Sequence, residues 1–230
     1  MLLPLLMIPG LLCDAVLYRA QVEALSDVAA VAVPDVTVDD SVGAMAARIL
    51  AVAPPRFSLA ALSMGGYVAF EIMRQAPERV ERLALLSTSA TPDAPSRAAE
   101  RRRWMASLQL GHFVGVSRRM LPQLIHPSCV ETDVGETVRR MAARVGGEAF
   151  LRQQQAILNR PDSRPTLATI TVPTIVIVGE DDVLTPVAEA QIIHQGVAGS
   201  VLHVLPRCGH LPALERPSDI SQLLRTWLSR

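Results

Sequence analysis

Short, almost unbroken apolar runs alternate with longer amphipathic segments, and this alternation limits the possible folds more than any other feature of the sequence. The apolar runs cover residues 2–8, 28–33, 57–62, 83–87, 174–178 and 201–205. Helical patterns cover residues 41–53, 64–76 and 218–229, and another begins at Pro186. A strand that is apolar at every position is typical of a parallel sheet covered by helices on both faces. The sequence therefore predicts an α/β protein whose mostly parallel, twisted sheet has about six strands.

One long stretch interrupts the alternation. Residues 91–165 are rich in helical patterns and poor in strands. We therefore expect a helical cap at 91–165, inserted into an α/β core of residues 1–90 and 166–230. Residues 92–165 contain 12 Arg and 7 acidic residues, whereas the rest of the chain contains 10 Arg and 15 acidic residues. Two interpretations remain open, a solvated helical face or a lid that favours anionic substrates.

Composition argues against several classes of partner. The 22 basic residues are all Arg, they balance 22 acidic residues, and only 3% of the chain is aromatic. A neutral chain with few aromatic residues lacks the basic face and stacking platforms that bind nucleic acid. The apolar start is broken by Pro4, Pro9 and Gly10, has no basic n-region and is too short to span a bilayer. We expect a cytoplasmic protein with no nucleic-acid or membrane partner, in an oligomeric state that the sequence does not determine.

The cysteines indicate neither disulfides nor a metal site. Cys13, Cys129 and Cys208 lie far apart and are odd in number. This spacing provides no disulfide framework and no paired zinc ligands. A reducing compartment fits such a chain, and no metal is expected.

The segment around Ser63 carries the strongest chemical signal. An apolar run at 57–62 is followed at once by Ser63, then by Met64, Gly65 and Gly66, and then by a helical pattern. A serine on a sharp strand-to-helix turn needs small neighbours, and such a turn is the nucleophile elbow, G-x-S-x-G. Here Ala61 replaces the first Gly of that pattern. The turn would place the hydroxyl at a helix N-terminus, with the N–H of Met64 facing a developing oxyanion.

Later loops provide a base and an acid for that serine. The apolar run at 174–178 leads into Glu180, Asp181 and Asp182, and the run at 201–205 leads into His210. Side chains just after parallel strands lie at the functional edge of a sheet. A serine nucleophile requires a base, and the base requires an orienting carboxylate. The order of these groups along the chain is therefore serine, acid, histidine.

With this order, the chain resembles the α/β-hydrolase superfamily over nearly its whole length, and its small size and short cap resemble bacterial serine esterases and lactonases. The resemblance rests on Pro9-Gly10-Leu11-Leu12, Ala61-Leu62-Ser63-Met64-Gly65-Gly66, Gly179-Glu180-Asp181-Asp182 with Thr185-Pro186, and Cys208-Gly209-His210-Leu211 with Glu215-Arg216-Pro217. It implies that Ser63 is the nucleophile and His210 the general base and acid. It favours Asp182 over Asp181 as the orienting acid, with the choice open by one position.

The resemblance also implies an oxyanion hole and two departures from the family pattern. The second backbone donor beside Met64 would be Leu11, which follows Pro9-Gly10 where relatives usually have His-Gly. Many relatives begin with an antiparallel hairpin, whereas this chain starts at the following strand. The missing His leaves the backbone donor in place but removes a side chain that braces the loop. We expect the missing hairpin to alter the sheet edge and not the active site.

The expected function is hydrolysis of a small carboxylic ester through an acyl-enzyme intermediate, without any metal or organic cofactor. A small-molecule ester or lactone is the expected substrate. Ser63 argues against relatives that use Asp as the nucleophile. Enol-lactonase or carbon–carbon bond hydrolase activity on the same triad remains open, as does a non-catalytic binder of small ligands. The candidates for the substrate pocket are Tyr18, Trp104, Phe113 and Met120.

Overall fold

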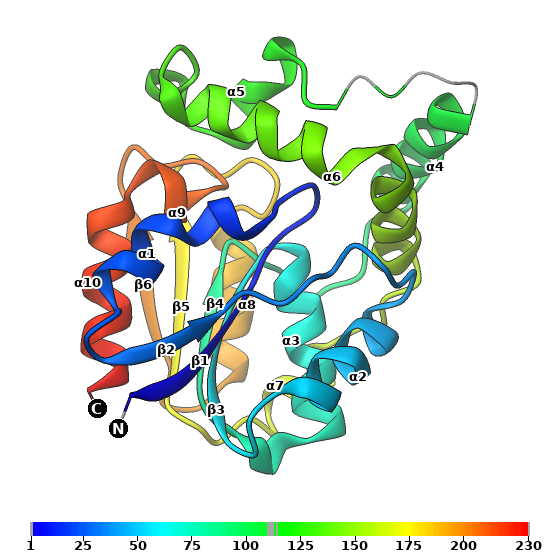
Figure 1. The fold of residues 1–230 in the computed structure, drawn as a ribbon. Helices are drawn as coiled ribbons and strands as arrows, with labels where there is room; N and C mark the ends of the chain where they lie inside the picture. The colour runs from blue at the N-terminus through cyan, green and yellow to red at the C-terminus, as the bar shows by residue number, and fades with distance from the viewer. Residues whose placement is uncertain (1, 110–112, 114, 230) are drawn as a thin grey trace.

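A parallel β-sheet forms the centre of the molecule (Figure 1). The computed structural model describes residues 2–109, 113 and 115–229. Within these residues the sheet has six strands, in the order β2-β1-β3-β4-β5-β6, and every neighbouring pair is parallel. The strands are β1 (Leu3–Ile8), β2 (Ala29–Ala32), β3 (Phe57–Leu62), β4 (Val80–Leu86), β5 (Thr174–Gly179) and β6 (Val201–Leu205). The predicted α/β class is confirmed, although β2 is shorter than its apolar run and β4 begins earlier.

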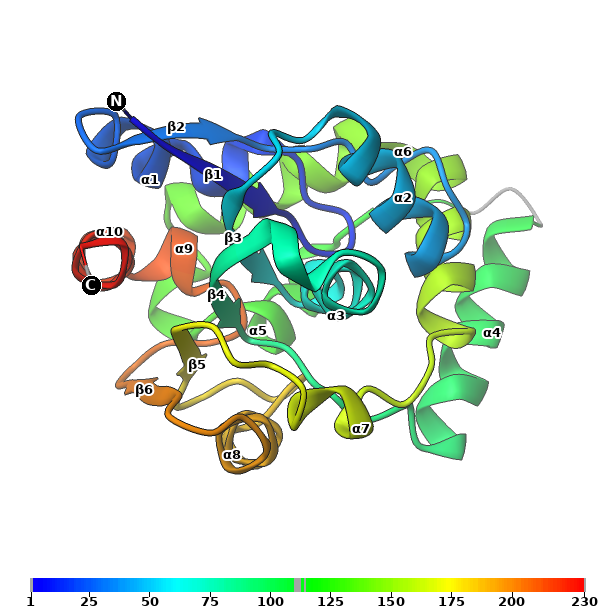
Figure 2. The same cartoon turned by 90° about the horizontal axis from the view of Figure 1, so that it is seen from below.

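Alternate residues of each central strand belong to two separate hydrophobic clusters. In β3, Leu59 and Ala61 pack in one cluster, whereas Ala60 and Leu62 pack in the other. The first cluster includes side chains of α2 (Val42–Val52), α3 (Met64–Gln75), α7 (Arg164–Leu167) and α8 (Val187–Gly196). The second includes side chains of α9 (Pro212–Glu215) and α10 (Pro217–Leu228), beside which α1 (Arg19–Ala24) lies (Figure 2). Burial on both faces explains why the strands have no polar alternation.

Local signals fix the ends and faces of the helices. The Ser41 hydroxyl oxygen accepts the N–H of Ala44 at 3.1 Å and so caps α2. In α10, Ile220, Leu224 and Trp227 are buried at helical spacing, which holds this helix against the sheet. Short 3₁₀ turns lie at Ala15–Tyr18, where Leu17 and Tyr18 are buried, and at Pro77–Arg79.

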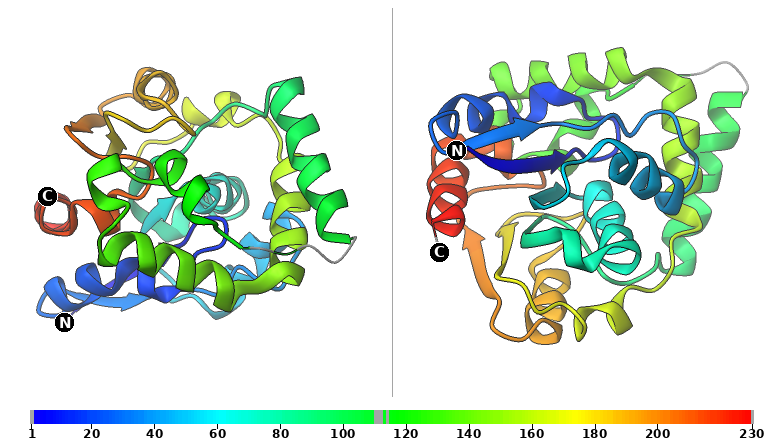
Figure 3. Two further views of the ribbon diagram at one scale, coloured as in Figure 1. Left: turned by 90° about the horizontal axis from the view of Figure 1, so that it is seen from above. Right: turned by 60° about the horizontal axis from the view of Figure 1, so that its bottom comes forward.

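Three of the helices between β4 and β5 lie over the carboxyl ends of the strands (Figures 1 and 3). They are α4 (Pro95–Gln109), α5 (Leu121–Leu124) and α6 (Asp133–Leu158), with 3₁₀ turns at Arg118–Met120 and Pro127–Cys129. Gly146, with φ of +79°, interrupts α6, because glycine reaches this conformation without a steric penalty. The second half of α6 then runs beside α4. The exact division into a core and a cap stays a prediction.

The thiols of Cys13, Cys129 and Cys208 are all free. Burial, together with the nearby Asp14 carboxylate, raises the pKa of Cys13 to about 12 against an opposing backbone hydrogen bond. No group of His, Cys, Asp and Glu in the described part of the chain could hold a metal ion. Among these same residues, no helix is long and apolar enough to cross a membrane.

Candidate active site

Ser63 lies on the strained turn that joins β3 to α3. Its backbone angles are φ +54° and ψ −117°, a conformation that residues with side chains rarely adopt. Its N–H donates to the Leu86 carbonyl at 3.0 Å, and its own carbonyl accepts the Thr88 hydroxyl at 2.8 Å. These bonds to β4 and the loop after it hold Ser63 at the N-terminus of α3.

The glycines after Ser63 are required by close contacts with neighbouring segments. A Cβ on Gly65 would lie 2.4 Å from the Ile8 carbonyl oxygen, and one on Gly66 would lie 2.2 Å from Thr88 Oγ1. Both distances are far inside van der Waals contact. Ala61, where the elbow pattern has its first Gly, is fully buried in β3. The turn therefore requires glycine after the serine and tolerates alanine before it.

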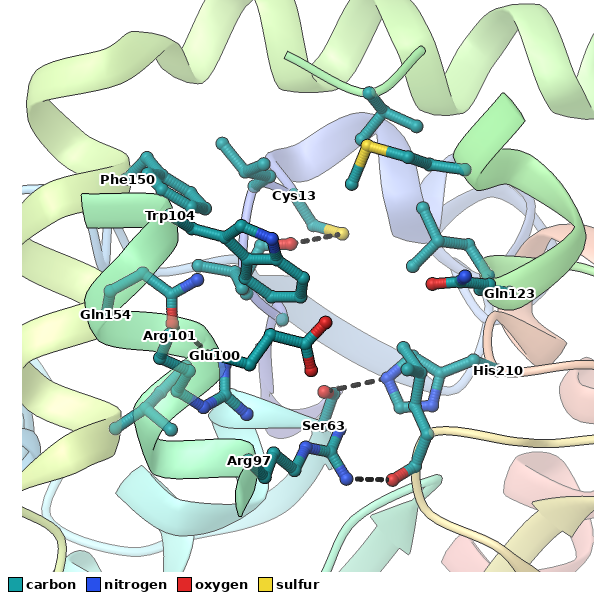
Figure 4. A pocket seen from close by; sticks show the side chains of 18 of the residues that line it. Cys13, Ser63, Arg97, Glu100, Arg101, Trp104, Gln123, Phe150, Gln154 and His210 are labelled. Carbon is teal, nitrogen blue, oxygen red and sulfur yellow. Dashed lines mark hydrogen bonds between the residues drawn. The ribbon is translucent and has the colours of Figure 1, made fainter. Parts of the chain in front are cut away.

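His210 connects Ser63 to Asp182. Its Nε2 atom lies 2.8 Å from Ser63 Oγ, and its Nδ1 atom lies 2.8 Å from Asp182 Oδ2 (Figure 4 shows the first of these bonds). The side chains of His210 and Asp182 are only 5% and 0% exposed. A proton on Nδ1 faces the carboxylate, which leaves Nε2 free to accept the serine proton. The three side chains thus form an unbroken chain of hydrogen bonds.

The Asp182 carboxylate is held ionised by its surroundings. Oδ1 accepts the N–H groups of Leu184 and Thr185, each at 2.9 Å, and Oδ2 accepts the Thr185 hydroxyl at 2.8 Å. Burial alone would raise the pKa of Asp182, but attraction to His210 and the hydrogen bonds from His210 and Thr185 outweigh it. The pKa of Asp182 therefore lies below its ordinary value. Thr185 was among the residues that carried the family resemblance, but sequence reasoning assigned it no role.

The neighbouring acid, Asp181, points elsewhere. Its side chain is 47% exposed, and its Oδ2 lies 3.8 Å from His126 Nε2. Gly179, at the end of β5, explains why Asp182 reaches His210. A Cβ on Gly179 would lie 2.1 Å from the Gly209 carbonyl oxygen, so only glycine lets the loops after β5 and β6 touch.

Glu215 holds the loop that carries His210 from both sides. Its Oε2 accepts the N–H of Gly209 at 2.9 Å and that of His126 at 2.7 Å, and its Oε1 accepts the N–H of Leu211 at 2.9 Å. Glu215 was among the residues that carried the family resemblance, but no pattern in the chain indicated a role for it. Its contacts become visible only when the loop is folded.

Two backbone amides lie where an oxyanion hole is expected. The N–H groups of Leu11 and Met64 donate to no acceptor in the described part of the chain. A Cβ on Gly10 would lie 3.2 Å from Ser63 Cβ, so the loop after β1 reaches the serine closely. These amides could stabilise negative charge that develops beside Ser63.

A cavity of about 730 Å³ opens over Ser63 and His210. Trp104, Phe113 and Met120 line it, whereas the expected pocket residue Tyr18 does not. Tyr18 is completely buried, and its hydroxyl donates to the Ile8 carbonyl at 3.0 Å. That expectation was wrong because the chain turns into a 3₁₀ turn after the loop, which directs the ring into the core. The cavity also has an unexpected polar wall that includes Arg101 and Gln154 (Figure 4).

The profile of the alpha/beta hydrolase family matches residues 15–223. The chain belongs to the alpha/beta hydrolase family. The matched region contains Ser63, Asp182 and His210 and confirms the family that the sequence resembles.

This alpha/beta hydrolase is similar to esterases and to a lactonase. It is 30% identical to a pimeloyl-[acyl-carrier protein] methyl ester esterase of Nitrosomonas europaea over 78% of this chain and 74% of the relative. It is 26% identical to 3-oxoadipate enol-lactonase 2 of Acinetobacter baylyi over 76% of this chain and 65% of the relative. Among solved structures, a thermophilic esterase from Thermogutta terrifontis has a TM-score of 0.88 and 30% identity, covering 99% of this chain and 89% of that one.

Proposed function

We propose that this alpha/beta hydrolase cleaves a small carboxylic ester through an acyl-enzyme intermediate on Ser63. The observation that carries the proposal is the continuous hydrogen bonding from Ser63 through His210 to Asp182 beneath a cavity. Relatives named as esterases, a methyl ester esterase and an enol-lactonase support cleavage of an ester bond. The small-molecule substrate and cytoplasmic location expected from the sequence are part of this proposal.

Acylation follows from the geometry. Ser63 Oγ attacks the ester carbonyl carbon while His210 Nε2 takes its proton, and Asp182 stabilises the resulting imidazolium. The carbonyl oxygen becomes an oxyanion that accepts the N–H groups of Leu11 and Met64. Each such donor contributes about 3–4 kcal/mol to the transition state. Collapse of the tetrahedral intermediate breaks the bond to the alcohol oxygen, which takes the proton from His210.

Deacylation repeats these steps with water. His210 Nε2 takes a proton from a water molecule as its oxygen attacks the acyl carbon, and the same amides accept the oxyanion. Ser63 leaves as the alcohol and regains its proton from His210. The products are a carboxylic acid and an alcohol, and no step uses a metal or an organic cofactor.

A lactone is the second candidate substrate. A lactone is an internal ester, so the same attack by Ser63 opens the ring and leaves the alcohol or enol oxygen tethered to the acyl group. The similarity to an enol-lactonase over 76% of this chain favours this candidate. A panel of linear esters and lactones of equal carbon number separates the two.

A fluorophosphonate probe tests the nucleophile directly. The wild-type protein should gain the mass of one adduct, and Ser63→Ala should gain none. Hydrolysis of short esters should then disappear in the same variant. A folded wild-type protein that forms no adduct and hydrolyses no ester would contradict the proposal and leave binding of a small ligand as the function.

A further inference from the structure

One wall of the cavity is both polar and buried. It is formed by α4 and the second half of α6, and it includes Arg101 and Gln154 (Figure 4). Arg101 is 5% exposed and Gln154 is 0% exposed. Polar groups at such depth normally have hydrogen-bond partners, because burial without a partner is unfavourable. The partners of these two side chains therefore indicate what the wall can bind.

The amide of Gln154 has a fixed orientation and an unused donor. Its Oε1 atom accepts Nη1 of Arg101 at 2.8 Å. A guanidinium group can only donate, so the amide oxygen must face Arg101 and the amide nitrogen must face away. Figure 4 shows this nitrogen on the side of Trp104, which lines the same cavity. Nε2 is buried and has no hydrogen-bond partner among the described residues.

The charges behind this wall do not cancel. Asp93 lies between two guanidinium groups, with Oδ2 2.5 Å from Arg101 Nε and Oδ1 2.9 Å from Arg160 Nη2. The three side chains are 5–6% exposed. Burial would raise the pKa of Asp93, but hydrogen bonds and attraction from Arg160 and Arg101 outweigh it, so the carboxylate is ionised. One negative charge facing two positive charges leaves the buried cluster with a net positive charge.

We propose that Gln154 and Arg101 form a subsite for a carboxylate that the substrate carries in addition to its ester. This inference rests on the proposed function and specifies its substrate class, monoesters of dicarboxylic acids. The second carboxylate would accept the free N–H of Gln154 Nε2 and offset the excess positive charge of the wall. The subsite uses residues that the hydrolytic steps at Ser63 do not.

The other charged groups of the cavity affect which carboxylate-bearing substrates fit the subsite. Arg97 and Arg103 line it as well, and Glu100 is the one acidic side chain among the described lining residues. In Figure 4 the Glu100 carboxylate points toward Ser63. It would repel a substrate carboxylate placed close to the ester, so the length of the diacid should decide the rate.

A series of substrates tests the subsite. We would compare kcat/KM for monomethyl esters of dicarboxylic acids, from succinic to suberic, with methyl alkanoates of equal chain length. At one or more chain lengths, kcat/KM for the monoester should exceed that for the methyl alkanoate at least about tenfold, because a hydrogen bond to a charged group contributes this much. Equal rates at every length would overturn the proposal.

Two variants of Gln154 connect the preference to the subsite. Gln154→Leu should reduce the ratio of kcat/KM for the monoester to kcat/KM for the neutral ester about tenfold. Gln154→Glu keeps an oxygen for Arg101 but replaces the donor with a negative charge, so it should reduce the ratio further. Gln155→Leu, a change at the next residue of α6 outside the cavity lining, is the matched control. An unchanged ratio in both Gln154 variants would overturn the proposal.

A binding measurement separates this inference from the hydrolase function. Calorimetry on Ser63→Ala should show tighter binding of the monoester than of the alkanoate ester, and adding Gln154→Leu should remove the difference. If the wild-type protein hydrolyses no ester but Ser63→Ala binds monoesters selectively, the proposed function fails and the subsite stands. If esters are hydrolysed but no selectivity appears, the subsite fails and the function stands.

Discussion

The side-chain oxygen of Gln153 accepts the backbone N–H of Leu12 at 3.0 Å and so ties α6 to the loop after β1. The amide nitrogen of the same Gln153 donates to the Val36 carbonyl at 3.2 Å, and the side chain is fully buried. Leu12 has φ of +58°, a conformation that needs support from its surroundings. Because Leu11 precedes this residue, we expect Gln153 to be a positioning residue for the proposed oxyanion hole.

Replacing Gln153 should therefore impair catalysis as well as stability. Gln153→Leu leaves the N–H of Leu12 and the carbonyl of Val36 without partners, which should lower the free energy of unfolding by about 1–3 kcal/mol. We expect kcat for a short ester to fall by about tenfold or more, because the oxyanion donor is no longer held in place.

Two control variants separate a loss of oxyanion-donor positioning from a loss of folding stability. Gln153→Glu keeps an oxygen for Leu12 and should recover part of kcat, whereas Gln155→Leu should change neither quantity much. Steady-state kinetics and urea unfolding measure the two effects. A Gln153→Leu protein that is less stable but has the wild-type kcat would show that the contact only holds the fold together.

Glu215 should control the position of His210. Its carboxylate accepts three backbone N–H groups, including those of Gly209 and Leu211 on either side of His210. Glu215→Gln replaces one acceptor oxygen with a donor, which cannot accept an N–H. We expect kcat to fall about 10- to 100-fold with a smaller change in KM, since small displacements of a catalytic group cost this much.

The rate of reaction with a fluorophosphonate provides a second measurement for Glu215, because it depends on the Ser63–His210 pair and not on substrate affinity. It should fall in parallel with kcat. If a folded Glu215→Gln protein reacted with the fluorophosphonate at the wild-type rate, this result would contradict the role assigned to Glu215.

The sequence predicted what depends on local patterns. Uniformly apolar runs predict buried parallel strands, and Ser63 with its two glycines predicts a tight turn, because both are consequences of nearby residues. The sequence could not predict contacts between distant segments. Gln153 and Leu12 are 141 residues apart in the sequence, and the hydrogen bond between Gln154 and Arg101 joins α6 to α4. Tyr18 was misplaced for the same reason, since closeness along the chain to Leu11 does not determine where a ring points.

The choice between two adjacent acids also needed the folded loops, and it can be tested. Asp182→Asn should reduce kcat by about 10⁴-fold, because an amide no longer holds His210 in the required tautomer. Asp181→Asn changes an exposed side chain near His126 and should leave kcat within about threefold of wild type. Kinetics of the two variants on one ester decides the matter, and the opposite pattern would assign the orienting role to Asp181.

The buried cluster around Asp93 should make stability depend on pH. The pKa of Asp93 in the folded protein lies below its ordinary value of 3.8, despite the opposing effect of burial, because Arg160 and Arg101 bind the carboxylate. In the unfolded chain the pKa returns to this ordinary value. The unfolded state therefore binds more protons as the solution is acidified. The stabilisation by Asp93 is fully present well above pH 4 and is lost as the pH falls through the folded pKa.

Asp93→Asn isolates this contribution. At pH 7 the variant should unfold with a free energy about 3–5 kcal/mol lower than wild type, because two guanidinium groups lose their buried counter-charge. Urea unfolding at pH 7, 5, 4 and 3 should show this difference narrowing below pH 4, even though other carboxylates also titrate in both proteins. Asp162→Asn, at an exposed pair with Arg164, is the control and should cost only about 0–1 kcal/mol. A large difference that stays constant down to pH 3 would mean that Asp93 contributes through packing and not through its charge.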